Sequence, residues 1–227
     1  MPPAIICHRG LCRATARSRR RAENTIAAFR EGIAALCELG FPPSIEFDVR
    51  RSADRRLVVI HDPTLRRTAG VRGRVSRHTA AELADFGIPL LTDVLDRFSG
   101  VEFHVEIKEP GLARDVKNLI LGRRLQDRTI VSSFDWGELA QLAPEVRFAL
   151  TSSLPTRRTV RLAAEMGACA IHPAHRRTNR VLVEAAHAAG LRVHAWTVNT
   201  PAAYRRLERL GVDAVFSDNP RLLAGLQ

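Results

Sequence analysis

Short apolar runs and amphipathic segments alternate along almost the whole sequence, and this alternation restricts the possible folds more than any other feature. The apolar runs have a composition typical of strands, and they cover residues 4–8, 44–49, 57–61, 101–108, 129–133, 147–151, 168–172, 191–198 and 212–217. Segments with helical signals cover residues 26–39, 79–82, 92–98, 111–125, 136–142, 156–166, 178–189 and 200–210. Repeated strand–helix units predict a parallel sheet covered by helices.

One of these runs does not fit a regular strand–helix order. Only residues 50–56 separate the run at 57–61 from the strand before it, and this connection is too short for a crossover helix. Ser52-Ala53-Asp54 has the composition of a turn, so we expect a hairpin above the sheet. The remaining strands predict an α/β fold, a single TIM (β/α)8 barrel domain over residues 1–227, with a short insertion after the second strand at about residues 50–90.

The composition is that of a globular protein. At 227 residues, with 45% hydrophobic and 26% charged residues, the chain has a size at which barrels form single domains. No apolar run approaches the roughly 20 residues that span a bilayer, and the first residues lack the basic region of a signal peptide. The four cysteines include no CxxC pair, so we expect reduced thiols in a cytoplasmic protein.

The net charge of +11 comes from 35 basic residues, of which only Lys108 and Lys117 are lysines. We interpret this arginine bias mainly as a bias of composition. The densest cluster favours a phosphate-bearing substrate or transient contact with an anionic membrane surface, and it consists of Arg13, Arg17, Arg19, Arg20 and Arg21. Basic and aromatic residues do not interleave as in nucleic-acid-binding proteins, so we expect no nucleic-acid partner. The oligomeric state is left open.

Three acidic residues occupy unusual positions in the predicted strands. Glu46 and Asp48 alternate with apolar residues, so both carboxylates point to the same face of one strand. Glu106 lies near the end of the next barrel strand, and in a TIM barrel the carboxyl ends of the strands form the active site. A set of carboxylates suits a hard cation, Mg²⁺ or Ca²⁺. The alternative is that nearby basic residues neutralise the acids: Arg9, Arg50 and Lys108.

Histidines stand at the ends of several runs. His8 ends the first strand and His61 ends the hairpin run, and an imidazole suits both general acid and general base catalysis near neutral pH. His172, at another strand end, is a candidate for the wall of the pocket. Trp196 is interpreted either as an aromatic wall that binds the substrate or as part of the core. His104 and His194 receive no assigned role.

The motifs at these positions resemble those of the glycerophosphodiester phosphodiesterase family, over nearly the whole chain and in the same order. The similar segments are His8-Arg9-Gly10, Glu23-Asn24-Thr25, Glu46-x-Asp48, His61-Asp62-x-x-Leu65-x-Arg67-Thr68, Glu106-Ile107-Lys108, Trp196-Thr197-Val198-Asn199 and residues 211–220. The resemblance implies a TIM barrel that uses a divalent metal to hydrolyse glycerophosphodiesters to an alcohol and glycerol 3-phosphate.

The same resemblance implies a role for each matching residue. His8 and His61 are similar to the catalytic pair. The remaining matches are the metal ligands Glu46, Asp48 and Glu106, the phosphate contacts Arg9 and Lys108, and Asn24, which binds the substrate or positions the site. The resemblance leaves open which histidine is the acid, and whether water or a substrate hydroxyl is the nucleophile.

Two departures from the family pattern concern the approach to the site. The loop before Glu23 is longer and rich in arginine, with Ala22 in place of a proline, and the segment between Thr68 and Ile88 is shorter than usual. Both departures affect recognition of the leaving group more than the metal or the histidines. The alternative functions are a phosphodiesterase that acts on lysophospholipids or other phosphodiesters, and a non-catalytic barrel that binds a phosphate ligand.

Overall fold

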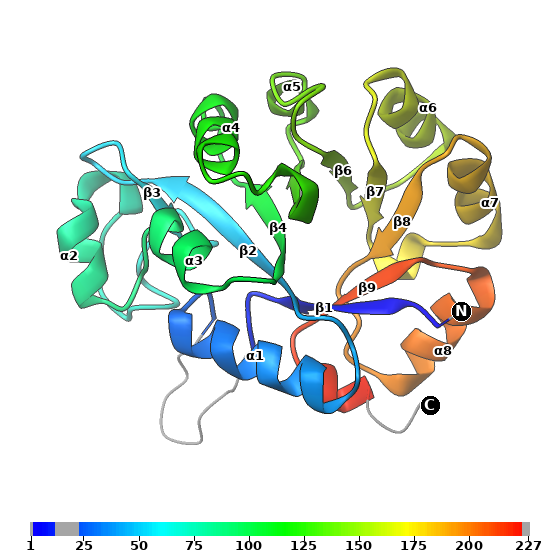
Figure 1. Cartoon of the computed structure of the whole chain (residues 1–227), viewed down its shortest axis with the longest axis horizontal. Coiled ribbons are helices and arrows are strands. Elements are labelled where there is room, and N and C mark those ends of the chain that lie inside the picture. Colours follow the sequence, from blue (N-terminus) through cyan, green and yellow to red (C-terminus); the bar gives the residue numbers. More distant parts are fainter. Residues whose placement is uncertain (1, 12–22, 224–227) are drawn as a thin grey trace.

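The computed structural model describes residues 2–11 and 23–223, and within them eight parallel strands close into a barrel (Figure 1). The strands follow one another around the ring in the order β1-β9-β8-β7-β6-β5-β4-β2, and a parallel pairing of β1 with β2, with His8 opposite Glu46, closes it. The barrel strands are β1 Ala4–His8, β2 Ser44–Arg51, β4 Glu102–Ile107, β5 Thr129–Ser133, β6 Phe148–Ser152, β7 Ala170–Pro173, β8 Arg192–Ala195 and β9 Ala214–Ser217. The predicted TIM barrel is confirmed.

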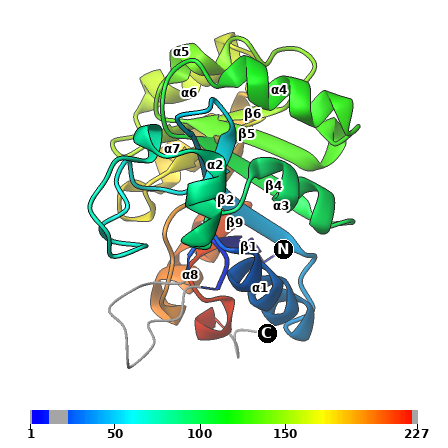
Figure 2. The ribbon, with the colours of Figure 1, turned by 90° about the vertical axis from the view of Figure 1, so that its left-hand side faces the viewer.

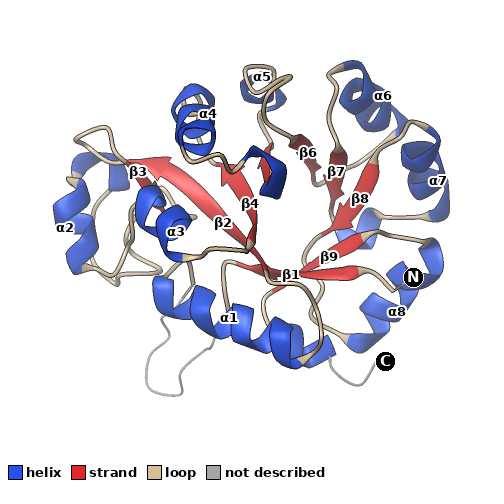
Figure 3. Ribbon diagram, in the orientation of Figure 1, coloured by secondary structure: helices blue, strands red, loops and turns tan. Residues whose placement is uncertain are grey.

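Helices surround the ring of strands, as Figure 3 shows. They are α1 Ile26–Glu38, α3 Leu91–Arg97, α4 Ala113–Gly122, α5 Trp136–Leu139, α6 Arg157–Glu165, α7 Arg180–Ala188 and α8 Pro201–Leu210, with 3₁₀ turns at η2 Gln126–Arg128, η3 His175–Arg177 and η4 Pro220–Leu223. The Thr25 side chain caps α1 by accepting a hydrogen bond from the Ala28 amide. Among the helices of the described ranges, none is long and apolar enough to cross a lipid bilayer.

Several predicted elements are shorter in the structure, and three of them differ most at their carboxyl ends. The helix predicted over 111–125 ends as α4 at Gly122, since glycine weakens a helix. The helix predicted over 136–142 ends at Leu139, and turns follow it. The strand predicted over 191–198 ends as β8 at Ala195, and an isolated parallel bridge between Ala174 and Trp196 follows it.

Between β2 and α3 the chain leaves the barrel. β3 Leu57–Val59 pairs antiparallel with β2, which confirms the predicted hairpin. The chain continues through η1 Val75–Arg77 and α2 Ala80–Asp85, and Figures 1 and 2 show this segment outside the ring of strands. The amide of Ile60 donates to the carbonyl of Asp48 at 2.9 Å. This bond holds His61, the next residue, beside β2.

Successive side chains of each barrel strand point alternately outward, toward the helices, and inward, into the barrel. Phe47 on β2 points outward, and its ring lies 5.7 Å from Phe29 of α1 and 6.1 Å from Phe103 of β4. Burial of each such side chain contributes about 2–3 kcal/mol. The neighbours of Phe47 in the strand, Glu46 and Asp48, point into the barrel, as the alternation predicted. The outward apolar face therefore supplies stability that offsets the burial of polar groups inside.

Candidate active site

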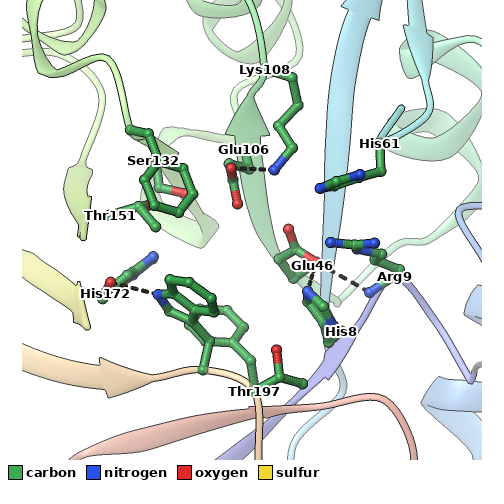
Figure 4. A pocket seen from close by; sticks show the side chains of 13 residues that line it. His8, Arg9, Glu46, His61, Glu106, Lys108, Ser132, Thr151, His172 and Thr197 are labelled. Carbon is green, nitrogen blue, oxygen red and sulfur yellow. Dashed lines mark hydrogen bonds and ion pairs between the residues drawn. The ribbon is translucent and has the colours of Figure 1, made fainter. Parts of the chain in front are cut away.

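A cavity of about 260 Å³ lies at the carboxyl ends of the barrel strands (Figure 4). All the predicted site residues except Asp48 and Asn24 line it. The complete lining consists of His8, Arg9, Glu46, His61, Glu106, Lys108, Ser132, Phe134, Thr151, His172, Trp196, Thr197 and Phe216. In the view of Figure 4, His8 and His61 flank Arg9 and Glu46, and His172 lies on the opposite side.

The carboxylates of Glu46, Asp48 and Glu106 meet at this cavity. The parallel register places Asp48 opposite Glu106 on the neighbouring strand, and one oxygen from each of the three side chains lies within 4.8 Å of the others. Burial raises the pKa of Glu46 to about 8, and the charge of Asp48 adds to this effect. Burial also raises the pKa of Glu106. Three buried acids of this kind need positive charge beside them.

Arg9 and Lys108 supply part of that positive charge. Arg9 Nε lies 3.2 Å from Asp48 Oδ2, and Lys108 Nζ lies 3.1 Å from Asp48 Oδ1. Lys108 Nζ also donates to Glu106 Oε1 at 2.5 Å. Asp48 is fully buried, yet the two cations outweigh its burial and hold its pKa well below the usual range. The ion pairs that the sequence offered as an alternative to a metal are therefore present around Asp48.

These ion pairs do not exclude a metal, and the three carboxylates fit one. Asp48 Oδ1 has the Lys108 ammonium as its ion-pair partner and accepts no further hydrogen bond from the residues that the structure describes. Arg9 and Lys108 bring two positive charges to three carboxylates, and burial raises the pKa of Glu46 and of Glu106. Hard divalent cations prefer oxygen ligands of this type. The donor set therefore favours Mg²⁺ or Ca²⁺ over zinc.

His8 lies between two carboxylates. Its Nδ1 is 2.6 Å from Asp218 Oδ1, and its Nε2 is 3.7 Å from Glu46 Oε2. Asn199 fixes Asp218 by donating from Nδ2 to Asp218 Oδ2 at 2.8 Å. Burial disfavours the charged form of His8, but Glu46 and Asp218 outweigh burial, and the pKa of His8 lies above its usual value. Sequence analysis assigns no role to Asp218 or Asn199, although both lie in the matching motifs.

His61 lies directly after the outer hairpin. Its Nδ1 is 2.7 Å from Asp62 Oδ1, and its carbonyl oxygen accepts a hydrogen bond from Arg50 Nε at 2.8 Å. Arg50 thus holds the backbone of His61 and does not neutralise the cluster of acids. Burial lowers the pKa of His61, and nearby cations lower it further. At neutral pH the two imidazoles therefore differ, with His8 more easily protonated than His61.

A chain of ion pairs joins Arg9 to Asp62. The carboxylate of Glu23 accepts hydrogen bonds from Arg9 Nη1 at 3.1 Å and from Arg67 Nη1 and Nη2 at 2.7 Å each. Arg67 Nε donates to Asp62 Oδ2 at 2.6 Å. Burial opposes the charge of Glu23, but hydrogen bonds from Arg67 and the charge of Arg9 lower its pKa overall. These ion pairs connect Glu23, which holds the Arg9 side chain, to Asp62, which holds the His61 ring. The sequence motifs did not predict them.

Asn24 does not line the cavity. Its side-chain Nδ2 donates a hydrogen bond to Asp48 Oδ2 at 2.8 Å, and its backbone N–H donates one to the carbonyl oxygen of Arg9 at 2.8 Å. Arg9 and Asn24 both have a φ of 57°, a conformation that is uncommon for residues other than glycine. Asn24 therefore holds Asp48 and the backbone of Arg9, which favours the positioning role over direct contact with a substrate.

Trp196 and Phe134 form an aromatic wall of the cavity. Their ring centroids lie 5.7 Å apart in an edge-to-face arrangement. Trp196 Nε1 donates to the carbonyl of His172 at 2.7 Å, and Lys108 Nζ lies 5.7 Å from the centre of the Phe134 ring. Trp196 also packs against a small apolar cluster inside the barrel. It therefore both lines the cavity and contributes to the core, and its contact with a substrate stays a prediction. Phe134, which is 46% exposed, received no role in the sequence analysis.

Three buried histidines lie in the barrel interior. His104 is on the same face of β4 as Glu106 but one layer deeper, and its ring contacts those of His172 on β7 and His194 on β8. Burial lowers the pKa of all three, to about 3 for His172. His172 lines the cavity, as the sequence suggested, whereas His104 and His194 do not.

The chain is similar to known proteins both in sequence and in fold. The sequence model of the "Glycerophosphoryl diester phosphodiesterase family" matches residues 8–222. A glycerophosphodiester phosphodiesterase of Caldanaerobacter subterraneus subsp. tengcongensis is 30% identical over an alignment of 249 positions, which covers 100% of this chain and 98% of that protein. The crystal structure of the Thermotoga maritima glycerophosphodiester phosphodiesterase is similar with a TM-score of 0.82 at 26% identity, covering 100% of this chain and 99% of that one. For the enzyme from Agrobacterium tumefaciens str. C58, the TM-score is 0.78 at 29% identity, with 98% and 99% covered.

Proposed function

Because the chain belongs to the glycerophosphoryl diester phosphodiesterase family, we propose that it hydrolyses glycerophosphodiesters to an alcohol and glycerol 3-phosphate. The observation that carries this proposal is the content of one cavity, where two imidazoles, two cations and a carboxylate cluster converge. Hydrolysis of a phosphodiester needs charge stabilisation at the phosphoryl oxygens and proton transfer at two oxygens. The residues around this cavity can supply both.

We assign binding of the phosphate to Arg9 and Lys108, together with a divalent metal held by Glu46, Asp48 and Glu106. When bound, Mg²⁺ or Ca²⁺ supplies Lewis-acid polarisation of the phosphoryl oxygens. Arg9 and Lys108 both reach the cavity and both contact Asp48. A phosphate between them would therefore lie against the carboxylate cluster.

We assign the two proton transfers from the environments of the histidines. His8, whose pKa is raised by Glu46 and Asp218 against the effect of burial, would donate its proton to the leaving alkoxide as the phosphorus–oxygen bond breaks. His61, whose pKa is lowered mainly by burial, would accept the proton of the attacking water as the new phosphorus–oxygen bond forms. If a substrate hydroxyl attacks instead, a cyclic phosphodiester forms as the alcohol leaves, and water then opens the ring to give glycerol 3-phosphate. Asp218 and Asp62 hold Nδ1 of the two rings. Each ring therefore exchanges protons through its other nitrogen.

The wall formed by Trp196 and Phe134 supports a role in recognising the leaving group. The two rings offer an apolar, partly exposed surface beside the phosphate position, which suits a leaving group with an apolar part. Lysophospholipids are therefore a second substrate class to compare with glycerophosphodiesters. Contact with an anionic membrane and a cytoplasmic location stay predictions, and the arginine cluster at 13–21 lies outside the described residues.

The test is release of glycerol 3-phosphate from glycerophosphocholine. We expect EDTA to abolish the release and Mg²⁺ or Ca²⁺ to restore it. His8→Ala and His61→Ala should each reduce kcat by at least about 100-fold, because each removes one proton transfer. His187→Ala is the matched control, since His187 is an exposed histidine paired with Asp213 away from the cavity. Turnover close to normal in either active-site variant would refute that assignment.

A further inference from the structure

Three histidines inside the barrel take no part in the proposed reaction. One nitrogen from each of His104, His172 and His194 lies within 4.8 Å of the others. The rings of His172 and His194 stack with their centroids 5.2 Å apart, and the ring of His104 lies 6.0 Å and 5.7 Å from theirs. Phe216 packs on the group, 5.0 Å from the ring of His172. The three imidazoles therefore converge on one small volume.

Each of these side chains carries a polar atom that is buried without a partner. His104, His172 and His194 are 1%, 2% and 3% exposed. The atoms His104 Nδ1, His172 Nε2 and His194 Nδ1 form no hydrogen bond with any residue in the described part of the chain. Burying a polar atom in this way costs free energy, and leucine or phenylalanine would fill the space without that cost. Three histidines with such atoms, packed ring against ring, indicate a ligand that satisfies them.

A carboxylate lies near His104, at a distance longer than a hydrogen bond. Glu102 Oε1 lies 3.9 Å from His104 Nε2, and Nδ1 is the nitrogen without a partner. A carboxylate near the second nitrogen fixes the orientation of a ligating imidazole and makes it more basic. Two cations, Arg147 and Arg192, also act on the cluster and oppose a bound cation. Glu102 offsets one of them, because it lies 3.8 Å from Arg147.

We propose that His104, His172 and His194 form a site for a transition-metal dication of the zinc class, separate from the carboxylate site. Imidazole nitrogens suit Zn²⁺, Co²⁺ and Ni²⁺, whereas Mg²⁺ and Ca²⁺ prefer oxygen. The two sites therefore select different ions. Zinc–nitrogen bonds are about 2.0–2.1 Å long, so binding would draw the three rings closer together than they lie here. Three histidines leave one position of a tetrahedral ion for water.

The proposed site is adjacent to the substrate cavity and shares His172 with its lining. The carbonyl of His172 accepts the hydrogen bond of Trp196 Nε1. An ion bound to the His172 ring would therefore also hold the aromatic wall in place. Binding at this site does not depend on hydrolysis, so the site can be tested without an assay of activity.

Cobalt titration of metal-stripped protein tests the proposal, with excess Mg²⁺ present to fill the carboxylate site. We expect one tight equivalent of Co²⁺ with the intense visible absorption of a four-coordinate ion, displaced by Zn²⁺ and unaffected by more Mg²⁺. Mutation of a residue that hydrogen-bonds to a metal ligand lowers metal affinity by about 10- to 100-fold. His194→Leu removes a ligand itself, so the affinity for Co²⁺ should fall at least about 100-fold. Glu46→Gln, which changes only the carboxylate site, should bind Co²⁺ as wild type does.

Thermal unfolding gives a second readout. Zn²⁺ should raise the Tm of the wild type and of Glu46→Gln, because it binds only the folded site, and it should leave the Tm of His194→Leu unchanged. If His194→Leu does not fold, His104→Gln replaces it in both measurements. A wild type without the cobalt absorption, or histidine variants that bind Co²⁺ with undiminished affinity, would overturn the proposal.

Discussion

His8 Nδ1 and Asp218 Oδ1 lie 2.6 Å apart, although the two residues are 210 positions apart in the sequence. The contact depends on the closure of the barrel, because β1 pairs with β9 and places Cys7 opposite Ser217. Asp218 also accepts a hydrogen bond from Asn199 Nδ2 at 2.8 Å. The position of the His8 ring therefore depends on both ends of the chain.

Replacing Asp218 with asparagine should impair catalysis without preventing substrate binding. Asp218→Asn removes the negative charge that supports a protonated His8, so the pKa of His8 should fall. We expect kcat to fall about 10- to 100-fold, with KM within about threefold of the wild type. The pH profile of kcat checks the mechanism, since the limb that reports the protonated acid should move to lower pH.

Asp213→Asn is the control for this variant. Asp213 also pairs with a histidine, His187, at 2.9 Å, but the pair is partly exposed and distant from the cavity. Its kcat and pH profile should match those of the wild type. An unchanged pH profile in Asp218→Asn would contradict the role of Asp218.

Glu23→Gln should weaken both the fold and the site. Glu23 is 4% exposed and accepts hydrogen bonds from Arg9 and Arg67, so its loss removes one carboxylate partner from each guanidinium group. Among the described residues, Arg9 then keeps only Asp48, and Arg67 keeps only Asp62. We expect the free energy of unfolding to fall by about 1–3 kcal/mol, and kcat/KM to fall about 10-fold as Arg9 loses its support. Urea denaturation and the glycerol 3-phosphate assay measure the two effects.

The control is Glu38→Gln, which removes the charge from an exposed ion pair. Glu38 contacts Arg221 at 2.8 Å on the surface, and such pairs contribute about 1 kcal/mol or less. If Glu38→Gln and Glu23→Gln destabilised the protein equally, the buried ion pairs of Glu23 would not have the importance proposed for them.

The alternation of residues within strands predicted much of the site. The period of two in a strand places Glu46 and Asp48 on one face, and the structure has both inside the barrel. The odd spacing before residue 57 likewise predicted the hairpin that carries His61. These features depend on neighbours in sequence or on the general form of the fold, so they could be inferred without coordinates.

Partners contributed by distant segments could not be predicted in the same way. The contact between Glu23 and Arg67 depends on how the outer segment folds back onto the barrel. The contact between His104 and His194 could not be predicted either. Each is a histidine within a strand in the sequence, and only the register of the barrel shows that their rings meet. Local patterns specify the face on which a side chain lies, but they do not specify which distant residue it meets.

Gly10→Ala should be much more destabilising than Gly40→Ala. Both glycines have positive φ, 76° and 75°, which disfavours any side chain by about 1–2 kcal/mol. A Cβ on Gly10 would also lie 2.6 Å from the carbonyl carbon of Ala28, whereas one on Gly40 would meet nothing within 4 Å. We expect a loss of about 1–2 kcal/mol for Gly40→Ala and about 2–5 kcal/mol for Gly10→Ala.

The comparison of the two glycine variants isolates the contact with α1. Urea denaturation measures both, and activity is the second readout, since Gly10 directly follows Arg9 and its displacement should lower kcat/KM. Gly40 lies just beyond the far end of α1, so its variant should retain activity. Equal losses of stability would show that backbone conformation alone accounts for the need for glycine at position 10.

Glu46→Gln should stabilise the metal-free protein and destroy its activity. The pKa of Glu46 is about 8 in the folded chain, against 4.5 for an ordinary glutamate, so the folded state holds this proton more tightly than the unfolded state does. The wild type should therefore lose stability as pH rises from about 4.5 to about 8. Each unit of pKa corresponds to about 1.4 kcal/mol. We therefore expect Glu46→Gln to be more stable than the wild type by about 2–4 kcal/mol at pH 8.5, with almost no difference near pH 4.5.

Saturating Mg²⁺ should reverse the order of stability of Glu46→Gln and the wild type, because the ion stabilises only a chain with all three carboxylates. Urea denaturation after EDTA treatment, repeated with Mg²⁺, measures both effects, and parallel pH profiles for the two metal-free proteins would contradict the prediction.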